Sequence, residues 1–284
     1  MKRLTPPHSL PAEDYRQIAA AKRDKPHGRT LRRIANKVES ALADYIARTP
    51  DLQGMSKVGF GLKSTKALVH AYERATIPLT TLKAAIRTST RRASTRCQYC
   101  AGMNREPKTF DHYLEKKLYP QFSIFHRNLV PCCSDCNRDR LATVRGGVRC
   151  VIHFYDDPVD QLPALLEAVV VTHEVATFSV RAMPVPAPMT QLFERHFVSL
   201  RLEKRLRDVS GDELADMIDS VVGTQLPRVP GVVFDRARAE QQLLSDAAAK
   251  RRRSGNNYWL AALTEAAARS VLFLNECEHQ WGLR

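Results

Sequence analysis

Apolar residues recur every three or four positions along most of the chain, which is the pattern of helices with one buried face. The first such stripe predicts a helix over residues 28–49, and two further stripes predict helices over 64–74 and from Pro78 onward. Near the end, a stripe that starts at residue 256 or 257 and reaches Leu274 predicts a last helix. Both flanks of the sequence are therefore expected to be mainly helical.

Two stretches between these helices have the character of short strands. Residues 148–154 are largely apolar, and residues 175–183 alternate apolar with other side chains. Prolines 184, 186 and 188 then predict a stiff connector. Beyond it, Ser210 and Glu213 have capping-box spacing, which predicts a helix that begins there and stops at Gly223.

Composition narrows the class of protein. The 284 residues are 44% hydrophobic, which is enough apolar material for a folded core, and they contain no run of 18 apolar residues. The N-terminal segment lacks the apolar stretch of a signal peptide. We expect a cytoplasmic protein without a membrane segment, and the cysteine spacing suits a metal in a reducing compartment better than disulfides.

Charge points to a polyanionic partner. Lys and Arg total 44 against 30 Asp and Glu, a formal net charge of +14, and this favours nucleic acid as the partner. A solvated basic surface is the alternative. One basic run, containing Arg91, Arg92 and Arg96, leads into the first cysteine pair, where it would either bind phosphate or form a solvated helix end.

Four of the seven cysteines form two Cys-x-x-Cys pairs, Cys97 with Cys100 and Cys133 with Cys136. This spacing predicts a closed, tetrahedral Zn²⁺ site made by two knuckles. Only Cys133 gives the two-residue gap to Cys136, so the adjacent Cys132 is expected to be a spectator. Since four thiolates leave no open position on the zinc, any chemistry must come from other residues.

Candidate chemistry lies between and just after the knuckles. His112 suits a general base because its ordinary pKa lies near neutral pH, and the oxygens of Asp111 and Asn137 suit a hard cation such as Mg²⁺ or Mn²⁺. One geometric condition applies. Neighbouring residues of a regular strand point to opposite faces, so Asp111 and His112 can share a site only if the backbone bends there or a coordinated water intervenes.

The segments Phe110-Asp-His-Tyr-Leu, Tyr119-Pro-Gln-Phe-Ser and Asn128-Leu-Val-Pro-Cys-Cys-Ser-Asp-Cys-Asn resemble the ββα-metal core of HNH endonucleases with zinc knuckles. The resemblance implies that His112 is the general base, that Asp111 and Asn137 bind one Mg²⁺, and that Asn128 braces the loop that orients the histidine. His126 is a rival for the position of Asn128. Glu115 and Arg140 depart from the residues most frequent in the family, proline and lysine.

The resemblance implies an α+β fold, in which a zinc-bound core at 94–158 separates a basic helical region at 1–93 from a mixed, then helical region at 159–284. It further implies a metal-dependent enzyme that nicks or cuts double-stranded DNA, and by analogy a bacterial anti-phage or restriction effector with a protein partner. A non-catalytic zinc module that binds nucleic acid and an RNA-cleaving nuclease remain alternatives. Arg138 and Arg140 are expected to be phosphate contacts or exposed helix charges.

Overall fold

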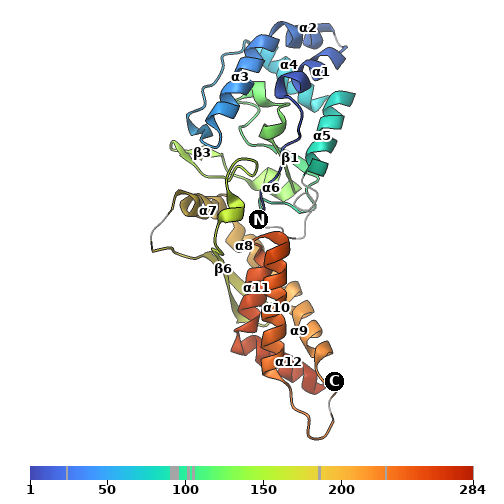
Figure 1. The fold of residues 1–284 in the computed structure, drawn as a ribbon, viewed down its shortest axis with the longest axis vertical. Coiled ribbons are helices and arrows are strands. Elements are labelled where there is room, and N and C mark those ends of the chain that lie inside the picture. Colours follow the sequence, from blue (N-terminus) through green and yellow to red (C-terminus); the bar gives the residue numbers. More distant parts are fainter. Residues whose placement is uncertain are drawn as a thin grey trace. The chain divides into compact units, whose positions relative to one another are not determined.

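The computed structural model describes residues 1–23, 25–89, 96–100, 103, 106–184, 187–227 and 229–283. Within these ranges the chain has an α+β fold of helices and three two-stranded antiparallel sheets (Figure 1). It divides into two compact units. The first unit consists of Arg3–Tyr99 and Asn104–Pro158, and the main part of the second is Val159–Arg284. The N-terminal helices therefore share one unit with most of the segment 97–139, which carries the two cysteine pairs and is called the cassette below.

In the first unit, five helices lie around a strand pair (Figure 1). These helices are α1 (Pro11–Ala21), α2 (Lys25–Arg33), α3 (Ala35–Arg48), α4 (Leu62–Glu73) and α5 (Ile77–Ser89), with a 3-10 turn η1 (Leu52–Gly54) between α3 and α4. The predicted positions of α4 and α5 are confirmed. The single helix expected over 28–49 is wrong, because the chain leaves helical geometry at Ile34 (φ −96°, ψ 7°) and forms α2 and α3 instead.

The cassette contributes strands and short turns to the first unit. Its elements are β1 (Thr109–His112), η2 (Pro120–Phe122), η3 (His126–Asn128), β2 (Leu129–Cys132) and α6 (Ser134–Asp139). β1 pairs antiparallel with β2, and α6 follows β2 directly. The side chain of Tyr45 on α3 is fully buried and packs edge-on against Phe122 and Phe125. The N-terminal helices thus complete the apolar core of the cassette.

A small hairpin follows the cassette, made by β3 (Val144–Arg145) and β4 (Val148–Arg149). Gly146 and Gly147 form its turn with φ of 56° and 76°, a conformation that favours glycine. The strand expected over 148–154 is therefore wrong beyond Arg149. Residues after it are buried as a loop, in which the Asp157 carboxylate accepts a hydrogen bond from the His153 backbone N–H at 2.7 Å.

The second unit is a strand pair covered by helices. Its elements are η4 (Val159–Gln161), β5 (Leu166–Thr172), β6 (Val175–Val180), α7 (Pro188–Ser199), α8 (Leu202–Arg207), α9 (Ser210–Thr224), α10 (Arg236–Ser254), α11 (Trp259–Ala268) and α12 (Val271–Leu283). β6 confirms the first part of the strand expected at 175–183, whereas its partner β5 was not predicted. Helix α11 packs against β5, and α8 packs against β6.

Two helices in this unit begin or end at other residues than expected, because serine hydroxyls form hydrogen bonds that were not predicted. The Ser210 hydroxyl accepts a hydrogen bond from the Ala176 N–H and donates to the Arg207 carbonyl, so the predicted capping box is wrong and Val209 is the N-cap of α9. The last helix is also divided, because Ser270 accepts a hydrogen bond from the Phe273 N–H and starts α12. α9 continues one residue past Gly223.

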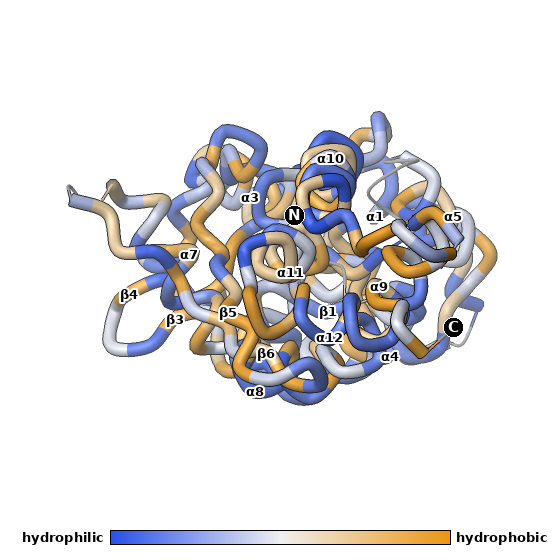
Figure 2. The backbone as a smooth tube through the Cα atoms, turned by 90° about the horizontal axis from the view of Figure 1, so that it is seen from below, coloured by the Kyte–Doolittle hydropathy of each residue, from blue (hydrophilic) through white to orange (hydrophobic). Residues whose placement is uncertain are grey.

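Hydrophobic and hydrophilic stretches alternate along the helices in Figure 2, as expected of elements with one buried face. Among the residues that the structure describes, no helix combines the length and the apolar character needed to cross a membrane.

Candidate metal centre and active site

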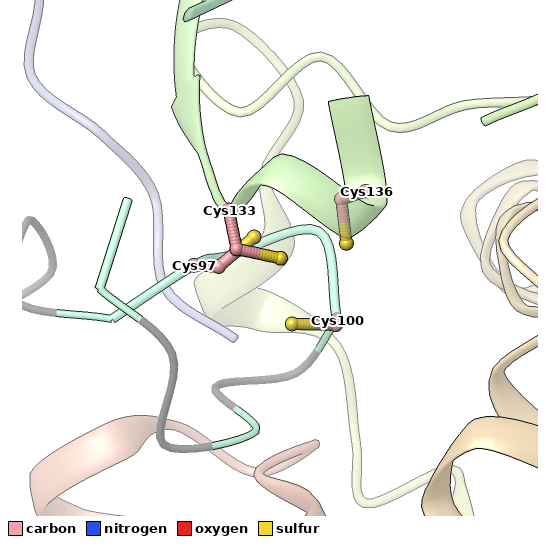
Figure 3. A group of neighbouring side chains, drawn as sticks. All are labelled: Cys97, Cys100, Cys133 and Cys136. Carbon is pink, nitrogen blue, oxygen red and sulfur yellow. The ribbon is translucent and has the colours of Figure 1, made fainter. Parts of the chain in front are cut away.

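Four buried cysteines, Cys97, Cys100, Cys133 and Cys136, form a cluster in which all sulfur atoms lie within 4.8 Å of one another. Figure 3 shows their side chains directed toward one another. A tetrahedral zinc site with Zn–S bonds of about 2.3 Å has sulfur–sulfur edges of about 3.8 Å, so a small contraction would bring this cluster to that geometry. The cluster could hold a metal ion such as zinc.

The expectation that Cys132 lies outside the cluster is confirmed. Cys132 is buried on β2, where its sulfur lies 3.5 Å from the Thr109 hydroxyl oxygen. Burial is the main cause that raises the pKa of Cys132 to about 12, so the thiol stays protonated at neutral pH. Cys150 and Cys277 are likewise buried and belong to no cluster of described metal-binding residues.

The strand β1 is regular where a bend was expected. Thr109 pairs with Cys132 and His112 pairs with Leu129, and the two residues between them keep the same register. Adjacent residues of such a strand point to opposite faces. Of the two alternatives, the bend at Asp111 and His112 is therefore wrong, and a shared site would need an intervening water. The two side chains have different surroundings.

Asp111 is held on one face of β1 by protein donors. The Arg140 Nε atom lies 2.7 Å from Asp111 Oδ2, Arg140 Nη2 donates to Oδ1 at 3.1 Å, and the Tyr99 hydroxyl donates to Oδ2 at 2.9 Å. The side chains of Arg140 and Asp111 are only 5% and 7% exposed. Burial is the largest single influence and lowers the pKa of Arg140, but the charge and hydrogen bond of Asp111, together with Tyr99 and Glu115, raise the pKa overall. The pair is a buried, charged and hydrogen-bonded contact.

This pairing does not fit the expected Mg²⁺ site. Arg140 contacts both Asp111 oxygens and the Tyr99 hydroxyl contacts one of them, so a cation that bound this carboxylate would have to compete with these donors. Asn137, which was expected to be the second ligand, is exposed on α6, and its amide nitrogen lies 3.5 Å from the Phe110 carbonyl oxygen. Asn137 thus lies near β1, but the Asp111 oxygens are already held by protein donors. The two expected ligands do not form an open cation site among the described residues.

His112 lies on the other face of β1 in a buried position, with 8% of its surface exposed. Its Nε2 atom lies 3.0 Å from the Ser123 carbonyl oxygen. Because a carbonyl oxygen can only accept, this contact requires the proton on Nε2 and leaves the lone pair of the neutral ring on Nδ1. Burial lowers the pKa of His112 to about 4, so the ring is neutral at pH 7 but is a weaker base than a histidine with the ordinary pKa that was expected.

Asn128 holds the loop that carries the Ser123 carbonyl. Its side-chain oxygen accepts from the Leu114 N–H at 2.8 Å, and its amide nitrogen donates to the carbonyls of Leu114 and Phe122 at 3.0 and 3.2 Å. Asn128 is fully buried. It therefore ties together the two ends of the segment between His112 and Ser123, which is the bracing role that the resemblance implies.

The rival histidine has different partners. His126 is buried, and its Nδ1 atom lies 3.1 Å from Asp14 Oδ2 on α1. The Ser9 hydroxyl donates to the same carboxylate oxygen. His126 thus connects the cassette to α1, and the geometry favours Asn128 for the bracing position.

A second polar network is buried beneath Asn128. The Tyr45 hydroxyl lies 2.9 Å from His153 Nε2 and 3.5 Å from Asn128 Oδ1. On the other side of the ring, His153 Nδ1 lies 2.8 Å from the Asp156 carboxylate, which also accepts from Arg127 at 2.6 Å. Because His153 is fully buried, it serves packing and has no route to a substrate phosphate.

The arginines expected at phosphate differ in availability. Arg138 is 68% exposed and pairs with Asp135 and Asp139, which makes it a solvated helix charge. The phosphate contact expected of Arg140 is wrong, because its guanidinium is buried against Asp111 and cannot contact phosphate in this arrangement. Arg96 is half-buried. Arg91 and Arg92 lie outside the described residues.

Sequence reasoning missed the residues that surround His112 from the N-terminal helices. The Tyr72 ring on α4 meets the His112 ring edge-on, with 4.3 Å between ring centroids. Lys83 on α5 and Lys116 in the cassette both lie over the Tyr72 ring. No local motif marks these positions. Tyr72 and Lys83 lie on two different helices, and only the folded arrangement brings them next to His112.

Comparison with known proteins gives one partial similarity. A 42-residue segment is 43% identical to part of Protein ea31 of Escherichia phage lambda. It covers 15% of this chain and 14% of the phage protein, so the two share a short segment and not their whole length. No family model and no solved structure matches the chain.

Proposed function

We propose that the chain is an endonuclease of the HNH type, which hydrolyses phosphodiester bonds in DNA with His112 as the general base. The carrying observation is the contact between His112 Nε2 and the Ser123 carbonyl, which leaves Nδ1 able to take a proton from water. The succession of β1, β2 and α6 beside four clustered cysteines supports the ββα-metal core implied by the resemblance. In this proposal, zinc held by the cysteines stabilises the core.

The chain's own residues divide the work in the proposed reaction. Asn128 fixes the loop, and the Ser123 carbonyl fixes the ring of His112. The neutral imidazole accepts the proton of water as the water oxygen attacks phosphorus, the P–O bond to the leaving sugar oxygen breaks, and that oxygen takes a proton from solvent. No step is assigned to a divalent cation, because Arg140 occupies the carboxylate expected to bind it. The role in bacterial defence stays a prediction.

The test is a nicking assay on supercoiled plasmid, run with Mg²⁺, with Mn²⁺ and with a chelator. Loss of a general base lowers the rate by about 10²–10⁴-fold, so His112→Ala is expected to abolish visible cutting while zinc content stays unchanged. His126→Gln is the matched control, because His126 is also buried in the cassette but pairs with α1. Unchanged cutting by His112→Ala would refute the assignment.

The engaged state of Asp111 favours a second candidate, a zinc-containing module that binds nucleic acid without cleaving it. This candidate predicts salt-dependent DNA binding together with intact plasmid under every metal condition. Whether the substrate is DNA or RNA is tested by incubating labelled RNA and labelled DNA of the same sequence with the chain and comparing their cleavage.

A further inference from the structure

The surroundings of His112 carry more positive charge than the proposed reaction uses. The Lys83 ammonium lies 3.9 Å from the centroid of the Tyr72 ring, and the Lys116 ammonium lies 5.1 Å from the same centroid. The electron-rich faces of a tyrosine ring attract cations, so the Tyr72 ring keeps both ammonium groups close to itself. Arg87, one turn after Lys83 on α5, lies over the neighbouring Phe110 ring.

This cluster is adjacent to the proposed general base. The Tyr72 and His112 centroids are 4.3 Å apart, and the Lys83 ammonium is 3.9 Å from the former, so that ammonium lies at most about 8 Å from the centre of the imidazole. The same addition places the Lys116 ammonium at most about 9 Å from it. These are distances over which a bound phosphate group could contact an ammonium while its reacting atom faces His112.

The cations repel one another. Burial lowers the pKa of Lys83, and the charges of Arg87 and Lys116 lower it further. Among the residues that the structure describes, Lys83 makes no ion pair with a carboxylate, whereas Lys116 pairs with Glu73 at 3.0 Å. A half-buried cation that faces two others is stabilised by an anion, and phosphate oxygens are strong acceptors for ammonium groups.

We propose that Lys83 and Lys116, positioned by the Tyr72 ring, bind a phosphodiester of the nucleic-acid strand that lies at His112. This inference rests on the proposed function, since it assigns the strand to the same face of β1 as the general base. It also gives a task to two N-terminal helices, because α5 supplies the Lys83 charge and α4 supplies the Tyr72 ring that positions it beside Lys116 of the cassette.

The test is equilibrium binding of a fluorescent DNA duplex to the full chain, measured by anisotropy at several salt concentrations. The slope of log affinity against log salt falls by about 1 for each phosphate that is no longer neutralised. Lys83→Met with Lys116→Gln removes both ligands of one phosphodiester, so it is expected to lower the slope by about 1 and to weaken binding about tenfold near 0.1 M salt. Lys117→Gln, an exposed neighbour outside the cluster, is the matched control and should bind as the unchanged chain does.

The experiments distinguish a failure of the proposed phosphate site from a failure of the proposed nuclease activity. If the double variant loses affinity and slope while the unchanged chain cuts no DNA, the phosphate site holds and the proposed function fails. If the chain cuts DNA through His112 but the double variant binds like Lys117→Gln, the phosphate site is overturned. Lys116→Gln alone is the second variant, because its Glu73 pair is solvent-exposed and its loss should leave thermal unfolding unchanged.

Discussion

Replacing Arg140 by alanine would remove the main partner of a buried carboxylate. Arg140 contacts both oxygens of Asp111, at 2.7 and 3.1 Å, and both side chains are less than a tenth exposed. Breaking a buried pair from one side typically costs about 3–5 kcal/mol. The Tyr99 hydroxyl would still donate to the carboxylate, so we expect a loss near the lower end, about 3 kcal/mol in the free energy of unfolding.

Urea unfolding of the zinc-loaded chain, followed by circular dichroism, measures this loss as a lower midpoint at unchanged slope. Arg138→Ala is the matched control, since its 68% exposed side chain forms solvated pairs that are worth less than about 1 kcal/mol. The double variant Asp111→Leu, Arg140→Met removes both charges and should be more stable than Arg140→Ala. The reasoning is refuted if Arg140→Ala unfolds at the same midpoint as Arg138→Ala.

Three further outcomes are expected. Cys136→Ser should reduce zinc, measured by atomic absorption, from one per chain toward none and destabilise the cassette, and a full zinc content in that variant would contradict the four-cysteine site. Tyr45→Phe leaves the buried His153 Nε2 without its partner at 2.9 Å and should cost about 1–3 kcal/mol in thermal unfolding, whereas an unchanged melting temperature would mean that the contact contributes nothing. The pKa of His112 is lowered from 6.5 to about 4, so the unfolded chain takes up this proton first on acidification. Stability should therefore fall by roughly 1 kcal/mol between pH 8 and pH 6, and a His112→Asn variant, compared by urea unfolding at both values, should lack that part of the decrease.

The clustering of the four cysteines and the buried position of Asn128 were predictable because their signals are local. Two Cys-x-x-Cys pairs specify a metal site almost independently of the rest of the fold, and the choice of Cys133 over Cys132 needed only a count of residues. Asn128 was predictable because it precedes the second cysteine pair in the segment that resembles the HNH motif. Predictions from such local spacing do not require knowledge of the tertiary contacts.

The Arg140 pair was not predictable because it depends on two choices that the sequence leaves open. The strand had to stay regular so that Asp111 faced the end of α6, and Arg140, 29 residues later, had to turn inward and not toward solvent. Helix limits failed for a related reason: Ser210 has the chemistry of a cap but is recruited by β6. In each case a contact between distant segments outweighed a correct local preference.

The burial of Tyr45 has a consequence for protein engineering. Its ring fills a space lined by Phe122, Phe125 and His153, all of which lie within residues 94–158, while Tyr45 itself comes from α3. Residues 94–158 cut out alone would carry an open hole where this ring sits and an exposed imidazole beneath it. The smallest portable piece of this chain is therefore not the motif that a sequence scan would mark, but the motif together with its N-terminal helix.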